Sequence, residues 1–368
     1  MTTKLHIVCL DAPSPPDYGG AIEMFYKIKA LHESGVKIIL HYFDYKKNRN
    51  AKGLEAYCEN IFSYKRKSFF QTPTFSKPHI VASRINKDLI NRMNNDNAPV
   101  LLEGIHCTGL IPYLKKERKI VVRLHNDEAA YYQSLAKTEH NFFKRSYYKI
   151  ESRLLQSYQK KLSNEVTYAA ISQNDVTVFM QNYGLKNVFL LPPFTPWQHV
   201  TSRAGKGTYC LYHGNLGVAE NEAAALWLIE HVFAHVKIPF VIAGKNPSQK
   251  LKKRTATITH IHLKPDPSES ELEELIQQAH INVLPDFNNT GIKLKLLHAL
   301  FCGRFCITQG SEIEESSTVA FAQTPQAYMG FLKSYMNREF TVANIEERIK
   351  TVRQFNNAVN AAALNARL

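Results

Sequence analysis

Short apolar runs alternate with amphipathic stretches along the chain, and this pattern predicts an α/β protein. The first 45 residues predict one strand–loop–helix–strand unit, with its parts at 5–10, 11–20, 21–34 and 36–43. Apolar residues recur every three positions in the third part, as on one face of a helix: Ile22, Phe25, Ile28 and Leu31. Because strands alternate with helices, we expect a parallel sheet covered on both faces.

The same alternation continues along the chain and divides it into two parts. Before the division, further strands are predicted at 100–102, 120–124, 166–171 and 187–191. The segment Pro-Pro-Phe-Thr-Pro-Trp at 192–197 interrupts the rhythm and predicts a linker. After it, strands are predicted at 209–213, 240–243, 258–263, 281–284 and 305–308, and helices at 220–235, 270–279 and 292–302. The pattern predicts two doubly wound, Rossmann-like domains that face each other across a cleft.

The length of the chain supports this division. It has 368 residues, and domains commonly have about 100 to 200. We expect an N-terminal domain over 1–195, a C-terminal domain over 196–340 and a final helix over 341–368 that completes the N-terminal domain. Ligands of open α/β sheets bind at the carboxyl ends of the strands. The loops that follow strands are therefore the places to search for chemistry.

Charge is distributed unevenly between the two parts. The net charge of the whole chain is +14. Residues 1–195 hold 28 basic and 17 acidic side chains, a balance of +11, which leaves +3 for the rest. No motif of a nucleic-acid-binding module accompanies this excess, so we expect no nucleic acid as partner. The excess favours an acidic or membrane-bound partner of the first domain.

Cysteine usage and hydropathy indicate a cytoplasmic protein. The six cysteines are widely spaced except for Cys302 and Cys306, which fits free thiols better than a disulfide framework or a zinc site. The first ten residues lack the longer apolar core of a signal peptide, and no run of 18 apolar residues occurs. We expect a cytoplasmic location, with peripheral contact at the inner face of the membrane.

One stretch of the first domain carries an amphipathic pattern that bears on this contact. Over 140–163, an apolar stripe recurs at helical spacing: Phe143, Tyr147, Ile150, Leu154 and Tyr158. Basic residues recur on a different predicted face: Arg145, Lys149, Arg153 and Lys160. This pattern is also typical of an ordinary surface helix. Together with the charge excess, it favours contact with an anionic membrane or acceptor.

Two glycines, Gly19 and Gly20, precede the first predicted helix. Glycine lets a backbone approach a ligand closely, and the free N–H groups at the start of a helix favour an anion. The spacing is not the Gly-x-Gly-x-x-Gly of a dinucleotide site. Gly20 is therefore a candidate ligand-binding residue, with an ordinary surface loop as the alternative.

Polar side chains follow two predicted strands of the first domain. His125 and Asn126 come directly after the strand at 120–124. The ordinary pKa of histidine lies near neutrality, so His125 is a candidate to donate to or orient a ligand hydroxyl. Glu103 and His106 follow the strand at 100–102 and are candidates to line the same cleft. A purely structural role remains the alternative for each of them.

The second domain has three strand-to-loop transitions that suit an anionic ligand. Gly214 and Asn215 follow the first strand, and Lys245 follows the second. The third is a loop that leads into the predicted helix at 292–302, with lysines at 293 and 295. Cations are unfavourable at the N-terminus of a helix, so these lysines favour a bound anion such as a diphosphate.

Metal ligands are not indicated by the sequence. His231 and His235 are four residues apart on a predicted helix, but no third ligand accompanies them, and we interpret them as surface histidines. The chain also has no Asp-x-Asp pair. We expect neither a bound metal nor a cofactor.

Taken in order, these segments resemble the GT-B fold glycosyltransferases, and within them the retaining glycosyltransferase family four. The resemblance covers most of the chain. It rests on Pro-Pro-Asp-Tyr-Gly-Gly at 15–20, Leu-His-Asn-Asp-Glu at 124–128, His-Gly-Asn-Leu at 213–216, Val-Ile-Ala-Gly-Lys at 241–245 and the run from Thr290 to Gly303. It implies transfer of a hexose, with retention, from a nucleotide diphosphate sugar to a glycan or lipid-linked acceptor.

The resemblance also implies roles for single residues. His125 would contact the transferred sugar, and Lys245 would neutralise the leaving diphosphate. The N–H groups at Gly291 would meet the same phosphates, and such enzymes usually need no metal. The implied donor-binding residues are Gly20, Gly214, Asn215, Thr290, Gly291, Ile292, Lys293 and His298; those on the acceptor side are Glu103, His106 and Asn126.

The chain departs from the family pattern at two positions. The family often carries two glutamates in the last motif, and the matching positions here are Thr290 and His298. The second glutamate typically binds ribose hydroxyls, whereas a histidine hydrogen-bonds without a negative charge when neutral. A non-catalytic nucleotide- or sugar-binding protein of the same fold is therefore the alternative to an enzyme.

Overall fold

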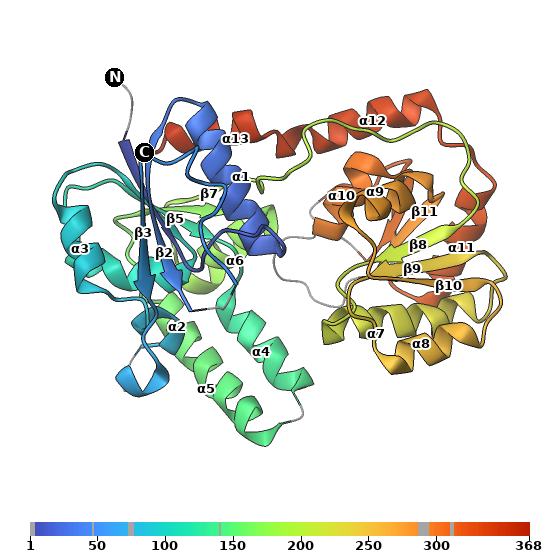
Figure 1. The fold of residues 1–368 in the computed structure, drawn as a ribbon, viewed down its shortest axis with the longest axis horizontal. Helices are drawn as coiled ribbons and strands as arrows, with labels where there is room; N and C mark the ends of the chain where they lie inside the picture. The colour runs from blue at the N-terminus through green and yellow to red at the C-terminus, as the bar shows by residue number, and fades with distance from the viewer. Residues whose placement is uncertain (1–3, 46–47, 73–76, 140, 286–293, 310–312) are drawn as a thin grey trace. The chain divides into compact units, whose positions relative to one another are not determined.

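The computed structural model describes residues 4–45, 48–72, 77–139, 141–285, 294–309 and 313–368. The chain forms two compact units; in Figure 1 the first is coloured from blue to green with its C-terminal segment in red, and the second mostly from yellow to red. Met1–Pro196 and Gln354–Leu368 form the first unit, and Trp197–Asn289 and Lys293–Arg353 form the bulk of the second. The boundary between Pro196 and Trp197 lies within the predicted linker.

The first unit contains a seven-stranded sheet in the order β3-β2-β1-β4-β5-β6-β7. Every pairing in it is parallel. Its strands are β1 (Lys4–Cys9), β2 (Lys37–Asp44), β3 (Asn60–Lys65), β4 (Val100–Glu103), β5 (Ile120–Leu124), β6 (Thr167–Ala170) and β7 (Val188–Leu190). The strand order reverses between β1 and β4, and ligands of doubly wound sheets bind at such a switch point.

Helices cover both faces of this sheet. On one face, α1 and α13 pack against residues such as Leu5 and Ile7, and on the other, α3, α5 and α6 pack against Val8 and Leu102. The helices of the unit are α1 (Gly19–Glu33), α2 (His79–Ala82), α3 (Lys87–Asn94), α4 (Glu128–Thr138), α5 (Phe142–Gln159), α6 (Gln173–Tyr183) and α13 (Asn357–Asn365), with the 3-10 turns η1 (Phe69–Gln71) and η2 (Ile105–Tyr113).

The second unit repeats this architecture with six parallel strands in the order β10-β9-β8-β11-β12-β13. Its strands are β8 (Cys210–His213), β9 (Phe240–Gly244), β10 (Ile261–Pro265), β11 (Ile281–Leu284), β12 (Phe305–Thr308) and β13 (Val319–Phe321). Its helices are α7 (Ala219–Leu228), η3 (Ile229–Phe233), α8 (Gln249–Ala256), α9 (Glu269–Gln278), α10 (Leu294–Cys302), α11 (Pro325–Met336) and α12 (Val342–Val352). The predicted pair of doubly wound α/β domains is confirmed.

The C-terminal segment differs from the single helix predicted over 341–368. It forms α12, a short turn η4 (Arg353–Phe355) and α13, and only the last of these helices packs on the first unit. The reason lies in Arg348 of α12, whose buried guanidinium donates to the carbonyls of Ala299 and Leu300 at the end of α10. Both carbonyls belong to the last turn of α10, where intrahelical partners run out, although Ala299 O also accepts from Gly303 N. Arg348 thus fastens α12 to the second unit.

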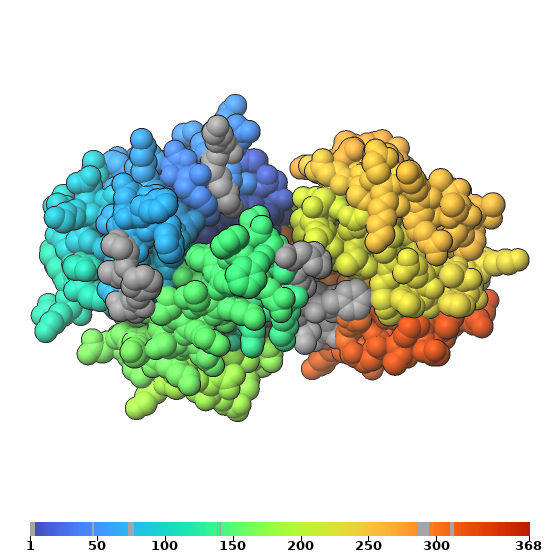
Figure 2. Space-filling view, turned by 90° about the horizontal axis from the view of Figure 1, so that it is seen from below, coloured from blue at the N-terminus to red at the C-terminus, as the bar shows by residue number. Residues whose placement is uncertain are grey.

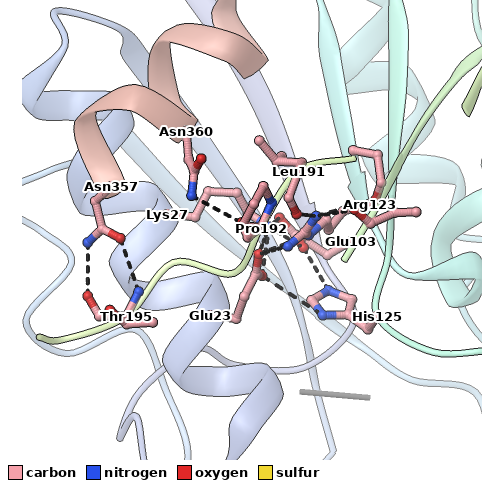
Figure 3. Close-up of polar contacts among 12 residues, drawn as sticks. Glu23, Lys27, Glu103, Arg123, His125, Leu191, Pro192, Thr195, Asn357 and Asn360 are labelled. Atoms are coloured by element: carbon pink, nitrogen blue, oxygen red, sulfur yellow. Dashed lines mark hydrogen bonds and ion pairs between the residues drawn. The ribbon is translucent and has the colours of Figure 1, made fainter. Parts of the chain in front are cut away.

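Helix α13 holds the end of the first unit in place (Figure 3). Asn357 accepts a hydrogen bond from Thr195 N at 3.1 Å and donates one to Thr195 O at 2.9 Å. Asn360 donates to Pro192 O at 3.3 Å. The predicted linker is thus bound to its own unit by side-chain amides.

No helix in the described ranges is both long enough and apolar enough to cross a membrane.

Candidate functional site

Five polar residues meet at the switch point of the first sheet, and we call them the charge cluster: Glu23, Lys27, Glu103, Arg123 and His125 (Figure 3). Glu23 and Lys27 lie on α1, which follows β1, and Glu103 is the last residue of β4. Arg123 lies in β5, and His125 follows that strand. Parallel strands place their carboxyl ends at one edge of a sheet, which explains why these distant residues come together.

Lys27 bridges the two carboxylates of the cluster. Its Nζ lies 2.7 Å from Glu23 Oε2 and 2.8 Å from Glu103 Oε1. All three side chains are fully buried. A buried charge is tolerated only when it is paired and hydrogen-bonded, so Lys27 is what allows both carboxylates to lie here.

Arg123 supplies the second positive charge. Its Nε donates to Glu23 Oε1 at 2.9 Å, and its Nη1 donates to Leu191 O at 2.5 Å. With the imidazole neutral, two carboxylates and two cations balance. Burial opposes ionisation of Glu23, but Arg123 and Lys27 outweigh it and lower the pKa of that carboxyl to about 2.

His125 is oriented by this cluster. Its Nε2 lies 2.8 Å from Glu103 Oε2, so we assign the ring hydrogen to Nε2, which donates to the carboxylate. Nδ1 is buried, has no hydrogen-bond partner among the described residues and lies 3.9 Å from Glu23 Oε2. In the neutral ring this nitrogen is an acceptor, and in this structure it is enclosed beside Glu23.

Glu23, Glu103 and His125 also have the spacing of a metal site, with ligand atoms within 4.8 Å of one another. The two carboxylates already bind Lys27, and Glu23 binds Arg123 as well. A divalent ion would bring two further positive charges beside these buried cations. The cluster fits a balanced positioning network better than a metal centre.

The residues after His125 anchor the loop. Asp127 caps α4, accepting from Ala130 N, and also accepts hydrogen bonds from Gln159 and Tyr183. Asn126 is half-buried, and its amide donates to Glu128 Oε1 at 3.4 Å. Burial raises the pKa of Glu128 to about 7. Glu128 thus places a carboxyl that titrates near neutrality beside Asn126.

The other predicted acceptor-side residues have different surroundings. Glu103 is fully buried beneath His125 and is not available to a ligand, contrary to the sequence-based expectation. It acts through His125, as a positioning residue. His106 is half-buried in η2, and Gly20 is half-buried in the first turn of α1, beside Tyr18.

In the second unit, predicted donor-side residues gather at the carboxyl ends of β8 and β9. Gly214 and the exposed Asn215 follow β8, and the exposed Lys245 follows β9. The two loops approach closely, because a Cβ on Gly244 would lie 1.8 Å from Gly214 O. Any side chain at Gly244 would therefore force the loops apart. Thr290, Gly291, Ile292 and Lys293 lie outside the described residues.

Lys295 is held within its own unit. Its Nζ donates to Asn221 Oδ1 at 2.9 Å and lies 5.2 Å from the centre of the Tyr212 ring. These contacts stabilise its charge near the start of α10 without a bound anion. Lys245, in contrast, has no side-chain partner among the described residues.

His298, the predicted ribose-binding residue, is stacked between aromatic rings. Its ring lies 4.4 Å from Trp197, at an angle of 21°, and meets His213 edge-on at 5.9 Å. Burial lowers the pKa of His298 to about 4. Within the described part of the chain, Nε2 of His298 is buried without a hydrogen-bond partner. The residue therefore packs the unit, with this nitrogen enclosed.

Sequence reasoning missed three members of the charge cluster. Glu23 and Lys27 are four residues apart, which is also typical of a solvent-exposed helix pair. Arg123 did carry a signal, because it interrupts the apolar run Ile-Val-Val-Arg-Leu of β5. An arginine in a buried strand requires acceptors, and the structure supplies them from Glu23 of α1 and from Leu191, the residue after β7.

Comparison with known proteins points to one class of enzyme. Residues 207–328 match the family described as Glycosyl transferases group 1. An uncharacterized 44.6 kDa protein in the cps region of Klebsiella pneumoniae is 26% identical over 332 residues, which are 86% of this chain and 85% of that protein.

Solved structures agree over the whole fold. The lipopolysaccharide outer core galactosyltransferase WaaB has a TM-score of 0.68 at 12% identity, covering 99% of this chain and 100% of its own. Sucrose-phosphate synthase from Thermosynechococcus elongatus has a TM-score of 0.67 at 11% identity, covering 99% and 98%. Anabaena HepE, in complex with UDP and glucose, has a TM-score of 0.64 at 9% identity, again over 99% and 98%. With its two doubly wound units, this chain has the GT-B fold and resembles the group 1 glycosyltransferases.

Proposed function

We propose that this protein transfers a hexose from a nucleotide diphosphate sugar to a glycan or lipid-linked acceptor, with retention and without a metal. The observation that carries the proposal is the buried charge cluster, which fixes His125 at the switch point of one sheet. The match of residues 207–328 to the group 1 family supports glycosyl transfer as the class of reaction. The cps region of the Klebsiella relative supports a role in polysaccharide synthesis.

The proposed chemistry consists of positioning and electrostatic stabilisation. Lys245 and backbone N–H groups after β8 stabilise the negative charge that develops on the leaving diphosphate. When the donor binds, the loop after β5 moves far enough to uncover Nδ1 of His125, which then accepts a hydrogen bond from a hydroxyl of the transferred sugar. Glu103 keeps Nδ1 as the acceptor by binding Nε2. Such preorganised groups lower a barrier because they need no rearrangement as charge develops.

Replacement of Lys245 by alanine should lower turnover about a hundredfold. The residue is exposed after β9, so its loss should leave the fold intact, and one preorganised stabiliser is worth roughly 2.7 to 4 kcal/mol of barrier. Steady-state kinetics with the preferred nucleotide sugar measures this effect. The exposed Lys237, replaced in the same way, is the control and should retain wild-type turnover. Equal turnover in both variants would remove Lys245 from the mechanism.

Two substitutions at His298 test its role in nucleotide binding. His298→Phe keeps a ring against Trp197 but removes Nε2, and it should weaken nucleotide binding about tenfold if that nitrogen accepts a ribose hydroxyl. His298→Glu replaces the neutral acceptor with a charged one and should change nucleoside affinity. Isothermal titration measures both variants. If neither substitution alters affinity, His298 serves packing alone.

A thermal-shift screen over nucleotide sugars tests the proposed function. A ligand that binds only the native state stabilises it by about 2.7 kcal/mol when its concentration is a hundredfold above its dissociation constant. This stabilisation raises the melting temperature. The donor that binds is then incubated with glycan and lipid-linked acceptors. NMR of the product reports whether the anomeric configuration is retained. An inverted product would refute retention, and no binding of any nucleotide would refute the proposal as a whole.

The packing of His298 favours a second candidate function, a non-catalytic nucleotide- or sugar-binding protein. The family position that often carries a ribose-binding glutamate here carries a ring stacked on Trp197. Binding of a nucleotide sugar without transfer to any acceptor would support this alternative.

A further inference from the structure

The hairpin formed by α4 and α5 projects from the body of the first unit (Figure 1). In α5, the exposed side includes residues of the predicted apolar stripe as well as basic residues. The side of α5 that faces its own unit contains the buried Glu151, Leu155 and Gln159, whereas Phe143 and Ile150 of the predicted apolar stripe are exposed. Green atoms of this part of the chain form part of the surface that faces the viewer in Figure 2.

Large apolar side chains are unusually exposed on α5. Phe142 is 74% exposed, Phe143 82% and Ile150 56%. Phe142 and Phe143 stack edge-on against each other, with ring centres 5.8 Å apart. Apolar groups this exposed are a recognised mark of an interaction surface when they are grouped and surrounded by polar residues.

The surrounding residues are basic. Lys144, Arg145, Lys149 and Arg153 are all exposed on α5. The helix has a single acidic residue, Glu151, which is buried and accepts a hydrogen bond from Ile80 N at 3.0 Å. The nearest acid before the helix is Glu139, whose carboxylate accepts from Asn141 N. The side of α5 opposite Glu151 and Leu155 thus combines apolar groups with three positive charges, because Arg145, Lys149 and Arg153 lie on the same half of the helix as Phe142, Phe143 and Ile150, whereas Lys144 does not.

We propose that Phe142, Phe143 and Ile150 of α5 insert into the headgroup region of an anionic bilayer, with Arg145, Lys149 and Arg153 bound to its phosphates. We call these six residues the docking face. Aromatic and aliphatic side chains in the interface, flanked by lysine and arginine, are the arrangement by which amphipathic helices lie on anionic membranes. Each basic residue near such a surface raises affinity about fivefold.

The same hairpin connects the docking face to the candidate site. Helix α4 begins at Glu128, three residues after His125, and Asp127 caps it. Gln159, at the end of α5, donates to Asp127 Oδ1 at 2.9 Å and accepts from Ala129 N at 3.3 Å. The two helices therefore return to the His125 loop. Docking at the other end of α4, about 16 Å away by helix rise, would hold this loop near the membrane, where a lipid-linked acceptor would be found.

Vesicle binding tests the proposal without any sugar transfer, so its outcome is independent of the proposed enzymatic function. The full chain is sedimented with vesicles of phosphatidylcholine containing about a third phosphatidylglycerol, at low and high salt. We expect binding at 50 mM salt that is largely lost at 500 mM, because screening shortens the range of surface charges. Absence of binding to these vesicles at low salt would overturn the proposal.

Matched variants locate the contact. The double variant Phe142→Ala, Phe143→Ala should bind at least about tenfold more weakly, whereas Tyr113→Ala, an exposed aromatic elsewhere on the unit, should bind normally. Replacing the three basic residues of the docking face with glutamine should abolish binding. The control removes the same charge from three exposed lysines of the unit: Lys87, Lys116 and Lys186. Equal losses in both charge variants would show attraction by net charge alone and overturn the proposal.

A tryptophan at position 143 reports insertion directly. In Phe143→Trp, anionic vesicles should shift the added emission to shorter wavelength, and brominated lipids should quench it. The wild-type chain, which has two tryptophans, gives the background for subtraction. Binding without quenching at position 143 would mean that the rings stay in water, contrary to the proposal. Melting temperatures of all variants should match the wild type, because the replaced side chains are exposed.

Discussion

Replacing Lys27 with methionine should lower the free energy of unfolding of the first unit by about 3 to 5 kcal/mol. Lys27 is fully buried and bonded to both Glu23 and Glu103. Its loss leaves two buried carboxylates beside a single arginine. Removal of one partner from a buried ion pair is costly because the remaining charge has neither water nor a counter-ion. Urea denaturation, monitored by circular dichroism, measures the effect.

Two further variants make this prediction specific. Lys29 lies on the same helix, but its side chain is 39% exposed and its ion pair with Glu33 is long, at 3.9 Å. Lys29→Met should therefore change the free energy of unfolding by less than about 0.5 kcal/mol. Adding Glu103→Gln to Lys27→Met restores the balance of one carboxylate and one arginine and should recover part of the lost stability. If Lys27→Met is as stable as Lys29→Met, the cluster does not hold the unit together.

Replacing His125 with alanine should lower turnover by a hundredfold or more while leaving the protein folded. The ring nitrogen Nδ1 is the group that we assign to the transferred sugar, and loss of one preorganised stabiliser raises the barrier by roughly 2.7 to 4 kcal/mol. Initial rates of sugar transfer measure the effect. His235→Ala, on an exposed residue of the second unit, is the control and should keep wild-type rates.

Glu103→Gln separates positioning from contact. Glutamine still accepts the hydrogen bond from His125 Nε2 through its amide oxygen, but it leaves Lys27 and Arg123 with one carboxylate. We expect a smaller loss of kcat than for His125→Ala and a changed pH dependence of kcat, because the charge beside the ring changes. A folded His125→Ala protein that transfers sugar at a normal rate would exclude the residue from the mechanism.

The fold was largely predictable because buried parallel strands are continuous apolar runs. Strands β5, β11 and β12 have the predicted bounds, and the others that were predicted shift by a few residues. The missed strands are β3 and β13. β3 lies at the edge of its sheet and has only one buried residue, Tyr64. β13 has three residues. Neither provides a long enough apolar run to be distinguished from a loop.

The amphipathic pattern of α5 shows a different limit. Helical spacing places Phe143 and Ile150 on one side of α5, but it does not tell which side of the helix packs against the rest of the unit. Contacts with α4 and the sheet decide this, and they bury Glu151 and Gln159 instead. The buried carboxylate is accepted because Ile80 N lies 3.0 Å away. A polar side chain can be buried where a hydrogen-bond partner lies within reach. That partner is distant in the chain, so the local sequence pattern does not reveal it.

Sequence alone determined the two α/β domains, because apolar periodicity and strand-to-loop order are local properties. It also singled out His125 and Lys245 as candidate site residues by their positions after strands. Only the tertiary structure placed Glu103 beneath His125 and joined both to Glu23, Lys27 and Arg123. Lys27 and Glu103 are 76 residues apart in the chain, and Glu23 and Arg123 are 100 apart. Ion pairs across such separations depend on how β1, β4 and β5 align, which is set by the packing of the whole sheet.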